Sequence, residues 1–249
     1  MSADLVSLQL YTVRGELDRD AVGTFAAIAG FGYRKVELYD FVRRFEAYRD
    51  GLAANGLVAP TAHSRLLDRD LDEIFDAAAA LGVATVYDPF IDESRWTTRD
   101  GIASVAADLN AIAAAAADRG LAIGYHNHAF EFANRFGGVS AFELLAEHLD
   151  EAVQLQVDTY WAVVGGESDV PALLRRVGGR VTALHIKDGP LTEDDDDQVA
   201  LGEGAMQFGP ILDAAPEALR VVELDGHRGD VLEAVRASHD HLRTAMVAG

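Results

Sequence analysis

The chain has 249 residues, 49% of them hydrophobic, which is enough for one large domain with a sizeable core, and no apolar run approaches the ~18 residues of a membrane span. Its formal net charge of −20 at pH 7 argues against a nucleic-acid partner, because proteins that bind nucleic acids usually carry a basic patch. The chain contains no cysteine, so it has no disulfides or thiolate metal sites, and any metal would be held by His, Asp, Glu or water.

The first half of the chain alternates between strand and helix patterns. The N-terminus enters the first strand pattern, LVSLQLYTV, without the basic segment of a signal peptide, and we expect a cytoplasmic protein. Glycines or an Asn-Gly pair close the helical patterns. The expected strands are residues 5–13, 35–39, 58–64 and 84–90, and the expected helices are residues 20–30, 42–54, 70–81 and 98–119.

The second half continues the alternation. Its first strand lies in LAIGYHNHAFEF, residues 121–132, and later strands are expected at 153–159, 181–188 and 219–227. Helices are expected at 140–149, after Asp169, after Phe208 and at 230–246. The acidic run 193–197 has no interleaved hydrophobic residue, which predicts a solvated loop rather than a cation site.

Eight strands alternating with eight helices, with no linker between them, predict a parallel sheet. Eight such units in this length are typical of a (β/α)8 TIM barrel, and we expect residues 1–249 to form one α/β domain of this kind. A doubly wound open sheet is the main alternative. It would normally carry a G-x-G-x-x-G turn after the first strand, and residues 13–16 lack that pattern.

Polar residues gather toward the carboxyl ends of the expected strands. In a barrel these ends meet at one face, where active sites lie. A single strand-end histidine is usually structural, but charged side chains in apolar strands are costly unless they are paired or liganded, so the set as a whole predicts a site. Its members are Glu37, His63, His126, His128, Asp158, His185, Lys187 and Glu223.

Seven segments give the chain a specific resemblance over nearly its whole length. It resembles the sugar phosphate isomerase/epimerase family, within the xylose-isomerase-like TIM barrel superfamily. The segments are SLQLYTVR at 7–14, KVELY at 35–39, YHNHAFEF at 125–132, QVDTYW at 156–161, HIKD at 185–188, LGEG at 201–204 and VVELD at 221–225.

The resemblance implies one divalent metal ion, of the Mn, Mg, Co or Zn kind, held by residues from the last four strands. Asp158, His185 and Glu223 match three of the family's ligand positions. Where many relatives carry a glutamate in strand five, this chain has His126, and the nearest carboxylate is Glu131. Either residue could complete the site, and we lean slightly toward Glu131, because carboxylate-rich sites suit Mn²⁺ or Mg²⁺.

The family chemistry implies an isomerase or epimerase that acts on a sugar or keto-sugar through a metal-stabilised enediolate. We expect Glu223 to be one acid/base and His126 or His128 the other. The expected substrate-binding residues are Glu37, His63, Lys187 and Trp161.

Three other functions remain open from the sequence. A metal-dependent dehydratase or lyase acting on a keto-sugar, keto-glycoside or inosose is the second candidate, because the strand-five glutamate is replaced. A non-catalytic sugar-binding barrel would have no reason to keep Asp158, His185 and Glu223 together. An endonuclease of the related DNA-repair barrels is disfavoured by the acidic charge. The expected partner is a small sugar, without nucleic acid or membrane, and a homo-oligomer is left open.

Overall fold

The computed structural model describes residues 5–247 and contains a closed barrel of parallel strands in the order β1-β10-β9-β8-β5-β4-β3-β2. This confirms the predicted single-domain (β/α)8 TIM barrel and excludes the open doubly wound sheet. The strands are β1 (Val6–Gln9), β2 (Lys35–Tyr39), β3 (Val58–His63), β4 (Thr85–Asp88), β5 (Ala122–His126), β8 (Val153–Asp158), β9 (Val181–Ile186) and β10 (Leu219–Val222).

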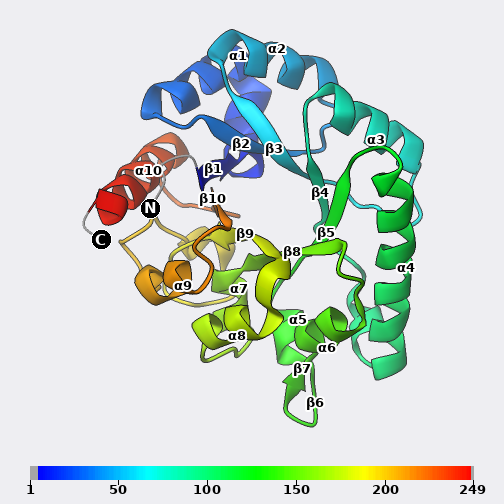
Figure 1. Cartoon of the computed structure of the whole chain (residues 1–249). Helices are drawn as coiled ribbons and strands as arrows, with labels where there is room; N and C mark the ends of the chain where they lie inside the picture. Colours follow the sequence, from blue (N-terminus) through cyan, green and yellow to red (C-terminus); the bar gives the residue numbers. More distant parts are fainter. Residues whose placement is uncertain (1–4, 248–249) are drawn as a thin grey trace.

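Helices surround the strands as an outer ring (Figure 1). The main helices are α1 (Arg14–Phe31), α2 (Phe45–Asn55), α3 (Leu71–Ala80), α4 (Arg99–Ala117), α6 (Ala141–His148), α8 (Val170–Val177), α9 (Phe208–Ala214) and α10 (Val231–Val247). Several begin at the caps that the sequence predicts: Thr98 accepts from Gly101 N, Ser140 forms a capping box with Glu143, and Asp169 caps α8. Within residues 5–247, no helix is long and apolar enough to cross a membrane.

The first strand is shorter than predicted. It ends at Gln9, whose side chain accepts a hydrogen bond from Tyr11 N and starts a short 3-10 helix over Leu10–Val13. Helix α1 then begins at Arg14 rather than near residue 20, and it is kinked at Asp20, where the backbone is not helical. The strand pattern of LYTV therefore reflects burial of Leu10 and Val13 and not continued sheet pairing.

The segment after β5 also differs from the prediction. The strand ends at His126 and is followed by the short helix α5 (Phe130–Ala133) and by a small hairpin, β6 (Arg135–Phe136) and β7 (Val139–Ser140). A further short helix, α7 (Thr159–Val164), follows β8 directly, because the Asp158 carboxylate caps it by accepting from Trp161 N.

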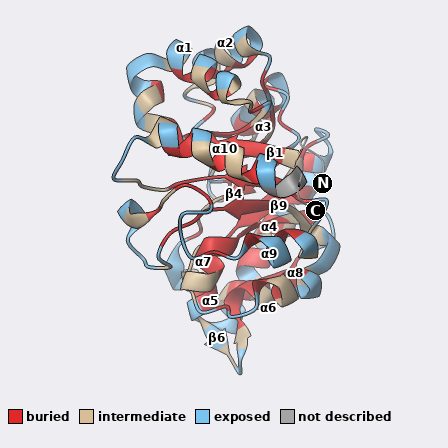
Figure 2. Cartoon of the chain, turned by 90° about the vertical axis from the view of Figure 1, so that its left-hand side faces the viewer, coloured by how far each residue is buried: buried red, intermediate tan, exposed pale blue. Residues whose placement is uncertain are grey.

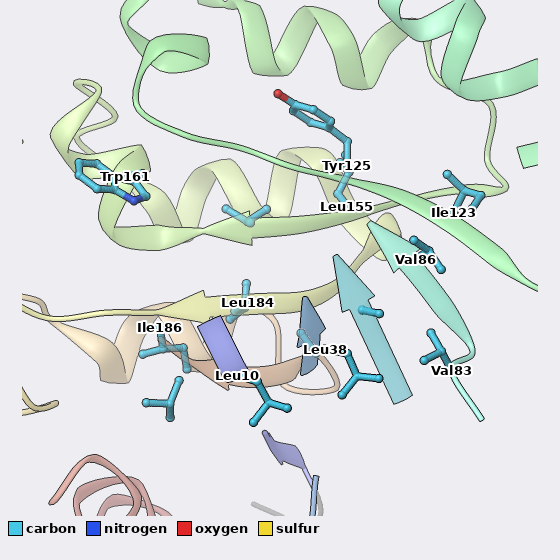
Figure 3. Packing of buried hydrophobic residues seen from close by; sticks show 14 of the residues in the cluster. Leu10, Leu38, Val83, Val86, Ile123, Tyr125, Leu155, Trp161, Leu184 and Ile186 are labelled. Carbon is cyan, nitrogen blue, oxygen red and sulfur yellow. The ribbon is translucent and has the colours of Figure 1, made fainter. Parts of the chain in front are cut away.

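The main hydrophobic core lies between the strands and the helices. Figure 2 shows buried strands enclosed by helices with exposed outer faces, and Figure 3 shows part of the core, including Val86, Ile123 and Leu155. Side chains alternate between faces along a strand, so these residues share the outward face with Tyr125, whose ring packs against Trp96 at a centroid distance of 5.1 Å. The helices are thus held by apolar contacts outside the barrel.

The interior of the barrel is filled differently at its two ends. Lower in the barrel, Tyr87, Ala183, Leu219 and Val221 form a separate small apolar cluster. The Tyr87 ring lies so close to β5 that a Cβ on Gly124 would be 2.4 Å from it, which requires a glycine there. Above this apolar cluster the interior of the barrel is polar. The apolar cluster therefore forms the base on which the polar site lies.

Asp188 organises the long loop between β9 and α9. It is fully buried, and its carboxylate accepts four backbone N–H groups, from Gly189, Gly202, Gly204 and Met206, at 2.9–3.1 Å. The predicted solvated acidic run lies farther along this loop, where Asp194, Asp196 and Asp197 pair with the exposed Arg228. The LGEG segment thus serves as a set of N–H donors for one carboxylate.

Replacing Asp188 by alanine is expected to lower the free energy of unfolding by about 3 kcal/mol or more, because it leaves several buried N–H groups without an acceptor. Chemical denaturation would measure this loss. The matched control is Asp196→Ala on the same loop, whose side chain is exposed and should change stability by less than about 0.5 kcal/mol. Equal stability of the two variants would contradict the anchoring role.

Candidate active site

Polar side chains from six barrel strands meet inside the upper end of the barrel. Glu37 on β2 reaches His185 on β9, with 2.6 Å between Oε1 and Nε2, although these strands are not neighbours. His63 on β3 likewise reaches Gln156 on β8, at 2.6 Å. Contacts between non-neighbouring strands can form only across the interior, so these side chains face inward. The predicted convergence of strand-end residues is therefore present in the structure.

Glu37 is the hub of the lower part of this cluster. It is fully buried, and its carboxylate is approached by Gln9 Nε2 at 2.8 Å, Gln156 Nε2 at 2.7 Å and His63 Nε2 at 3.1 Å, in addition to His185. Burial acts to raise the pKa of Glu37, but His63 and His185 outweigh it and hold the pKa well below its usual value. Glu37 is thus an ionised acceptor that holds the two histidines.

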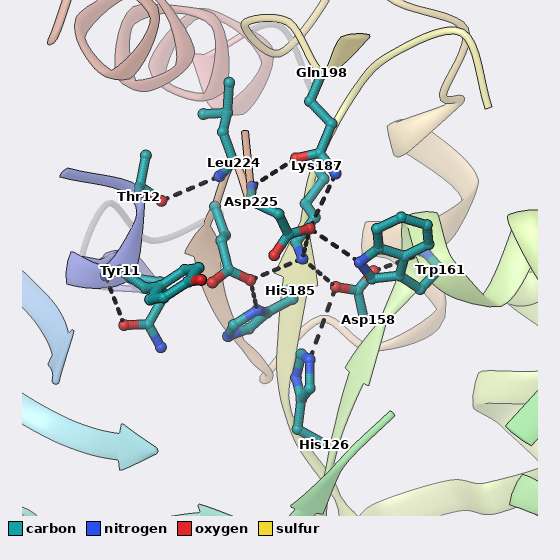
Figure 4. Close-up of polar contacts among 12 residues, drawn as sticks. Tyr11, Thr12, His126, Asp158, Trp161, His185, Lys187, Gln198, Leu224 and Asp225 are labelled. Atoms are coloured by element: carbon teal, nitrogen blue, oxygen red, sulfur yellow. Dashed lines mark hydrogen bonds and ion pairs between the residues drawn. The ribbon is translucent and has the colours of Figure 1, made fainter. Parts of the chain in front are cut away.

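Lys187 is the hub of the upper part, shown in Figure 4 between Asp225 and Asp158. Its Nζ lies 2.6 Å from Asp225 Oδ2, 2.9 Å from Asp158 Oδ2 and 2.9 Å from Glu223 Oε2. Burial acts to lower the pKa of Lys187, but these three carboxylates hold it well above the usual value. The side chain is therefore a buried ammonium group shared by three acidic residues.

His185 connects the two parts. Its Nδ1 lies 2.6 Å from Glu223 Oε2, while its Nε2 contacts Glu37. Burial acts to lower the pKa of His185, but Glu223 and Glu37 raise it to about 10, and the pKa of Glu223 is lowered below its usual value by Lys187 and His185 despite its burial. His185 is thus an imidazolium held between two carboxylates, with both ring nitrogens hydrogen-bonded.

His128 and Trp161 line a cavity of about 1040 Å³ above the cluster, together with His63, His126 and Glu223. The His128 ring lies against Phe130 and Phe90, with centroid distances of 5.8 Å to each. Burial lowers the pKa of His128 to about 4, so its imidazole is neutral at pH 7. Trp161 Nε1 donates to Asp225 Oδ2 at 3.0 Å, which fixes the indole at the wall of the cavity.

Glu131 lies apart from this cluster. Its carboxylate accepts hydrogen bonds from Tyr125 Oη and from His128 N, the latter at 2.8 Å, and burial raises its pKa to about 8. Tyr125 is on the outward face of β5, so Glu131 is turned toward the helices. The structure brings seven of the predicted residues toward one site in the barrel and places His128 on its cavity wall, but it does not bring Glu131 there.

Two groups of potential metal ligands occur among the described residues, and both include His185. One is Asp158, His185 and Glu223, and the other is His63, His126 and His185; in each group the ligand atoms lie within 4.8 Å of one another. Buried oxygen and imidazole donors of this kind suit a hard or borderline divalent ion.

The charges and bonding around Asp158 also fit a divalent ion. Glu37, Asp158, Glu223 and Asp225 carry four formal negative charges, whereas Lys187 and His185 carry two positive ones, which leaves two negative charges in excess. Asp158 Oδ2 is buried without a hydrogen bond, although it pairs with Lys187, so it retains capacity for a ligand.

Three residues that contact the cluster were missed from the sequence: Gln9, Gln156 and Asp225. A signal for the latter two was present, because each lies two residues from a predicted ligand in the same strand pattern, Gln156 before Asp158 and Asp225 after Glu223. Residues at i and i+2 of a strand share a face, so both could have been assigned to the interior. Gln9 gave no comparable signal, because β1 carries no charged residue.

The fold and the site together define a class of protein, a (β/α)8 barrel with a buried carboxylate–histidine cluster at the carboxyl ends of its strands. Within that class the chain belongs to the xylose isomerase-like TIM barrel family, whose model matches residues 25–244. No curated protein sequence shows significant similarity to the chain.

Several solved structures share the fold of the chain. A sugar phosphate isomerase/epimerase from Parabacteroides distasonis ATCC 8503 has a TM-score of 0.83 at 24% identity, covering 98% of this chain and 95% of that one. The IolI protein, in a zinc-bound structure, has a TM-score of 0.71 at 16% identity and covers 98% of both chains. D-psicose 3-epimerase, in the presence of D-fructose, has a TM-score of 0.66 at 15% identity, covering 97% and 98%.

Proposed function

We propose that the protein is a divalent-metal-dependent isomerase or epimerase that acts on a sugar or keto-sugar. The observation that carries this proposal is the group of Asp158, His185 and Glu223, of which Glu223 lines a large cavity, in a barrel of this family. Support also comes from structural neighbours that include a zinc-bound protein and an epimerase. A small sugar is the proposed partner, and the cytoplasm is the proposed location.

Asp158, His185 and Glu223 would hold the ion, which would be Mn²⁺, Mg²⁺, Co²⁺ or Zn²⁺. Of the two strand-five candidates, we now favour His126, because its Nε2 lies 4.0 Å from Asp158 Oδ2, whereas the Glu131 carboxylate is engaged by Tyr125. The bound ion would act as a Lewis acid that polarises the carbonyl and hydroxyl oxygens of the sugar.

The proton transfers are assigned to Glu223 and His128. Glu223 is ionised and borders the cavity, so it can accept a proton from the carbon next to the sugar carbonyl. His128 lines the same cavity as a neutral imidazole, which can pass a proton to or from the sugar. Return of the proton to the neighbouring carbon gives isomerisation, and return to the opposite face of the same carbon gives epimerisation.

Of the predicted substrate-binding residues, His63 and Trp161 line the cavity, whereas Lys187 does not line it and lies 2.9 Å from Glu223, which does. We propose that the Trp161 indole forms an apolar wall against the sugar and that His63 Nδ1 accepts a hydrogen bond from a sugar hydroxyl. The Lys187 ammonium is engaged by three carboxylates, so its proposed part is to balance their charge rather than to contact the sugar. Glu37 is already occupied by four donors, so its proposed part is to hold His63 and His185 in place.

A metal-dependent dehydratase or lyase is the second candidate. It is favoured by the identity of the groups that face the substrate. His126 stands where many relatives carry a glutamate, His128 lines the cavity, and Glu131 does not reach the site. A histidine and a glutamate can also remove a proton and protonate a leaving oxygen, which would complete an elimination.

Incubation of the metal-loaded protein in D₂O with a panel of ketoses and keto-sugars would separate the two candidates. We expect deuterium at the carbon next to the carbonyl, with no loss of water or of a glycosyl group, as mass spectrometry would show. Elimination products would support the dehydratase or lyase. Binding of sugars without any exchange or product would support the non-catalytic barrel instead.

A further inference from the structure

We propose that Gln156 is a positioning residue that fixes His126 with its hydrogen on Nδ1 and thereby makes His126 Nε2 a ligand of the metal ion. This inference rests on the proposed metal-dependent function. It assigns a role to a side chain from β8 that contacts no ion itself, and it selects His126 over Glu131 as the strand-five ligand.

The orientation of the Gln156 amide is set by Glu37. Gln156 Nε2 lies 2.7 Å from Glu37 Oε2, and both residues are fully buried. The Glu37 carboxylate also accepts from Gln9 and from His185, so it presents oxygens only. A flipped amide would place the Gln156 oxygen against a carboxylate oxygen at the same distance, and two acceptors would then repel each other without water between them. The amide nitrogen therefore faces Glu37.

The amide oxygen consequently faces two histidines. Gln156 Oε1 lies 2.6 Å from His63 Nε2 and 3.0 Å from His126 Nδ1. An amide carbonyl can only accept, and its two lone pairs match two N–H donors. His126 must therefore carry a hydrogen on Nδ1. A neutral imidazole has one N–H, which leaves the lone pair of His126 on Nε2.

The free nitrogen of His126 points toward the proposed metal ligands. His126 Nε2 lies 4.0 Å from Asp158 Oδ2, and Figure 4 shows the ring directed at that carboxylate. Two ligand atoms that are each about 2.1 Å from one ion can be at most about 4.2 Å apart, so this spacing is compatible with a shared ion. The hydrogen-bonded series Glu37–Gln156–His126 thus orients a ligand in the way that outer partners of metal-bound histidines commonly do.

Gln9 offers a matched control. It also donates an amide N–H to Glu37, at 2.8 Å, but within the described part of the chain it forms no hydrogen bond with a histidine. Gln156→Met and Gln9→Met each remove one amide donor from Glu37. Only Gln156→Met also removes the acceptor of His126. Any effect that arises through Glu37 alone should therefore appear in both variants.

The test combines histidine ¹⁵N NMR with calorimetric titration of Mn²⁺ or Zn²⁺. In the metal-free wild type, we expect His126 to show a protonated Nδ1 and an unprotonated Nε2. Gln156→Met should weaken metal binding about 10- to 100-fold, and His126 should no longer prefer the tautomer with its hydrogen on Nδ1. Gln9→Met should change metal affinity by no more than about threefold. Glu131→Gln should leave metal affinity within the same threefold range.

Several results would overturn the inference. They are a wild-type His126 with its hydrogen on Nε2, equal losses of affinity in the two glutamine variants, or a Glu131→Gln variant that no longer binds metal. The tautomer is measured in the wild type, so the test does not depend on the folding of a variant. A wild type that binds no divalent ion would contradict the proposed function and the ligand role together, while the tautomer would still show whether Gln156 orients His126.

Discussion

Asp158→Asn is expected to abolish tight binding of the divalent ion and to lower sugar turnover about a thousandfold or more. The substitution removes the negative charge of a fully buried ligand while retaining an oxygen that can accept from Trp161 N, so α7 keeps its cap. Loss of Lewis-acid assistance is worth several kcal/mol, and each 1.36 kcal/mol of barrier is a factor of ten in rate. Calorimetric titration would measure metal affinity, and deuterium exchange into a ketose would measure turnover.

The control for this change is Asp169→Asn. Asp169 also caps a helix through its side chain, accepting from Ala172 N at 2.9 Å, but it lies on the exposed side of the barrel, away from the ligand group. Metal affinity and turnover of this variant should match those of the wild type. If Asp158→Asn binds Mn²⁺ and Zn²⁺ as tightly as the control does, Asp158 is not a metal ligand and the proposed function loses its main support.

Lys187→Met is expected to raise the affinity for the divalent ion at least about tenfold and to destabilise the metal-free protein by about 3–5 kcal/mol. The Lys187 ammonium is 2.9 Å from both Asp158 Oδ2 and Glu223 Oε2, so in the metal-free protein it neutralises two of the proposed ligands. An incoming cation must displace it or be repelled by it, whereas methionine has a similar length without the charge. Without either cation, the buried carboxylates remain uncompensated, which accounts for the loss of stability.

Thermal unfolding with and without Mn²⁺, together with calorimetric titration, would measure both effects. Metal should stabilise Lys187→Met more than it stabilises the wild type, because tighter binding to the native state raises its stability further. Lys35→Met is the matched control, since Lys35 lies at the first residue of β2, at the opposite end of the barrel from the cluster. Unchanged metal affinity in Lys187→Met would show that the ammonium and the ion do not compete.

The alternation of side chains along β strands made much of the site predictable. Glu37, Asp158, His185 and Glu223 are charged or ionisable residues in otherwise apolar strands, and the rule that strand ends converge in a barrel was sufficient to bring them together. That rule holds only while the chain is extended.

The alternation no longer applies after His126, where β5 ends. The positions of His128 and Glu131 are set by the turn into α5, in which Glu131 accepts from His128 N and from Tyr125 Oη. The family pattern could not show this either, because this chain departs from it at that point. The role of Gln156 was missed for another reason. An uncharged amide in a strand does not indicate a functional site by itself, and its partners Glu37 and His126 are identified only in the structure.

The chain holds only two lysines, Lys35 and Lys187, among its 21 basic residues. A protein made with isotope-labelled lysine would therefore give two sets of lysine side-chain NMR signals, from opposite ends of the barrel. The signal of Lys187 originates among the carboxylates proposed to hold the ion, so it would report metal occupancy directly, while that of Lys35 would provide an internal reference. Metal loading could then be followed without a substrate and without altering a single residue.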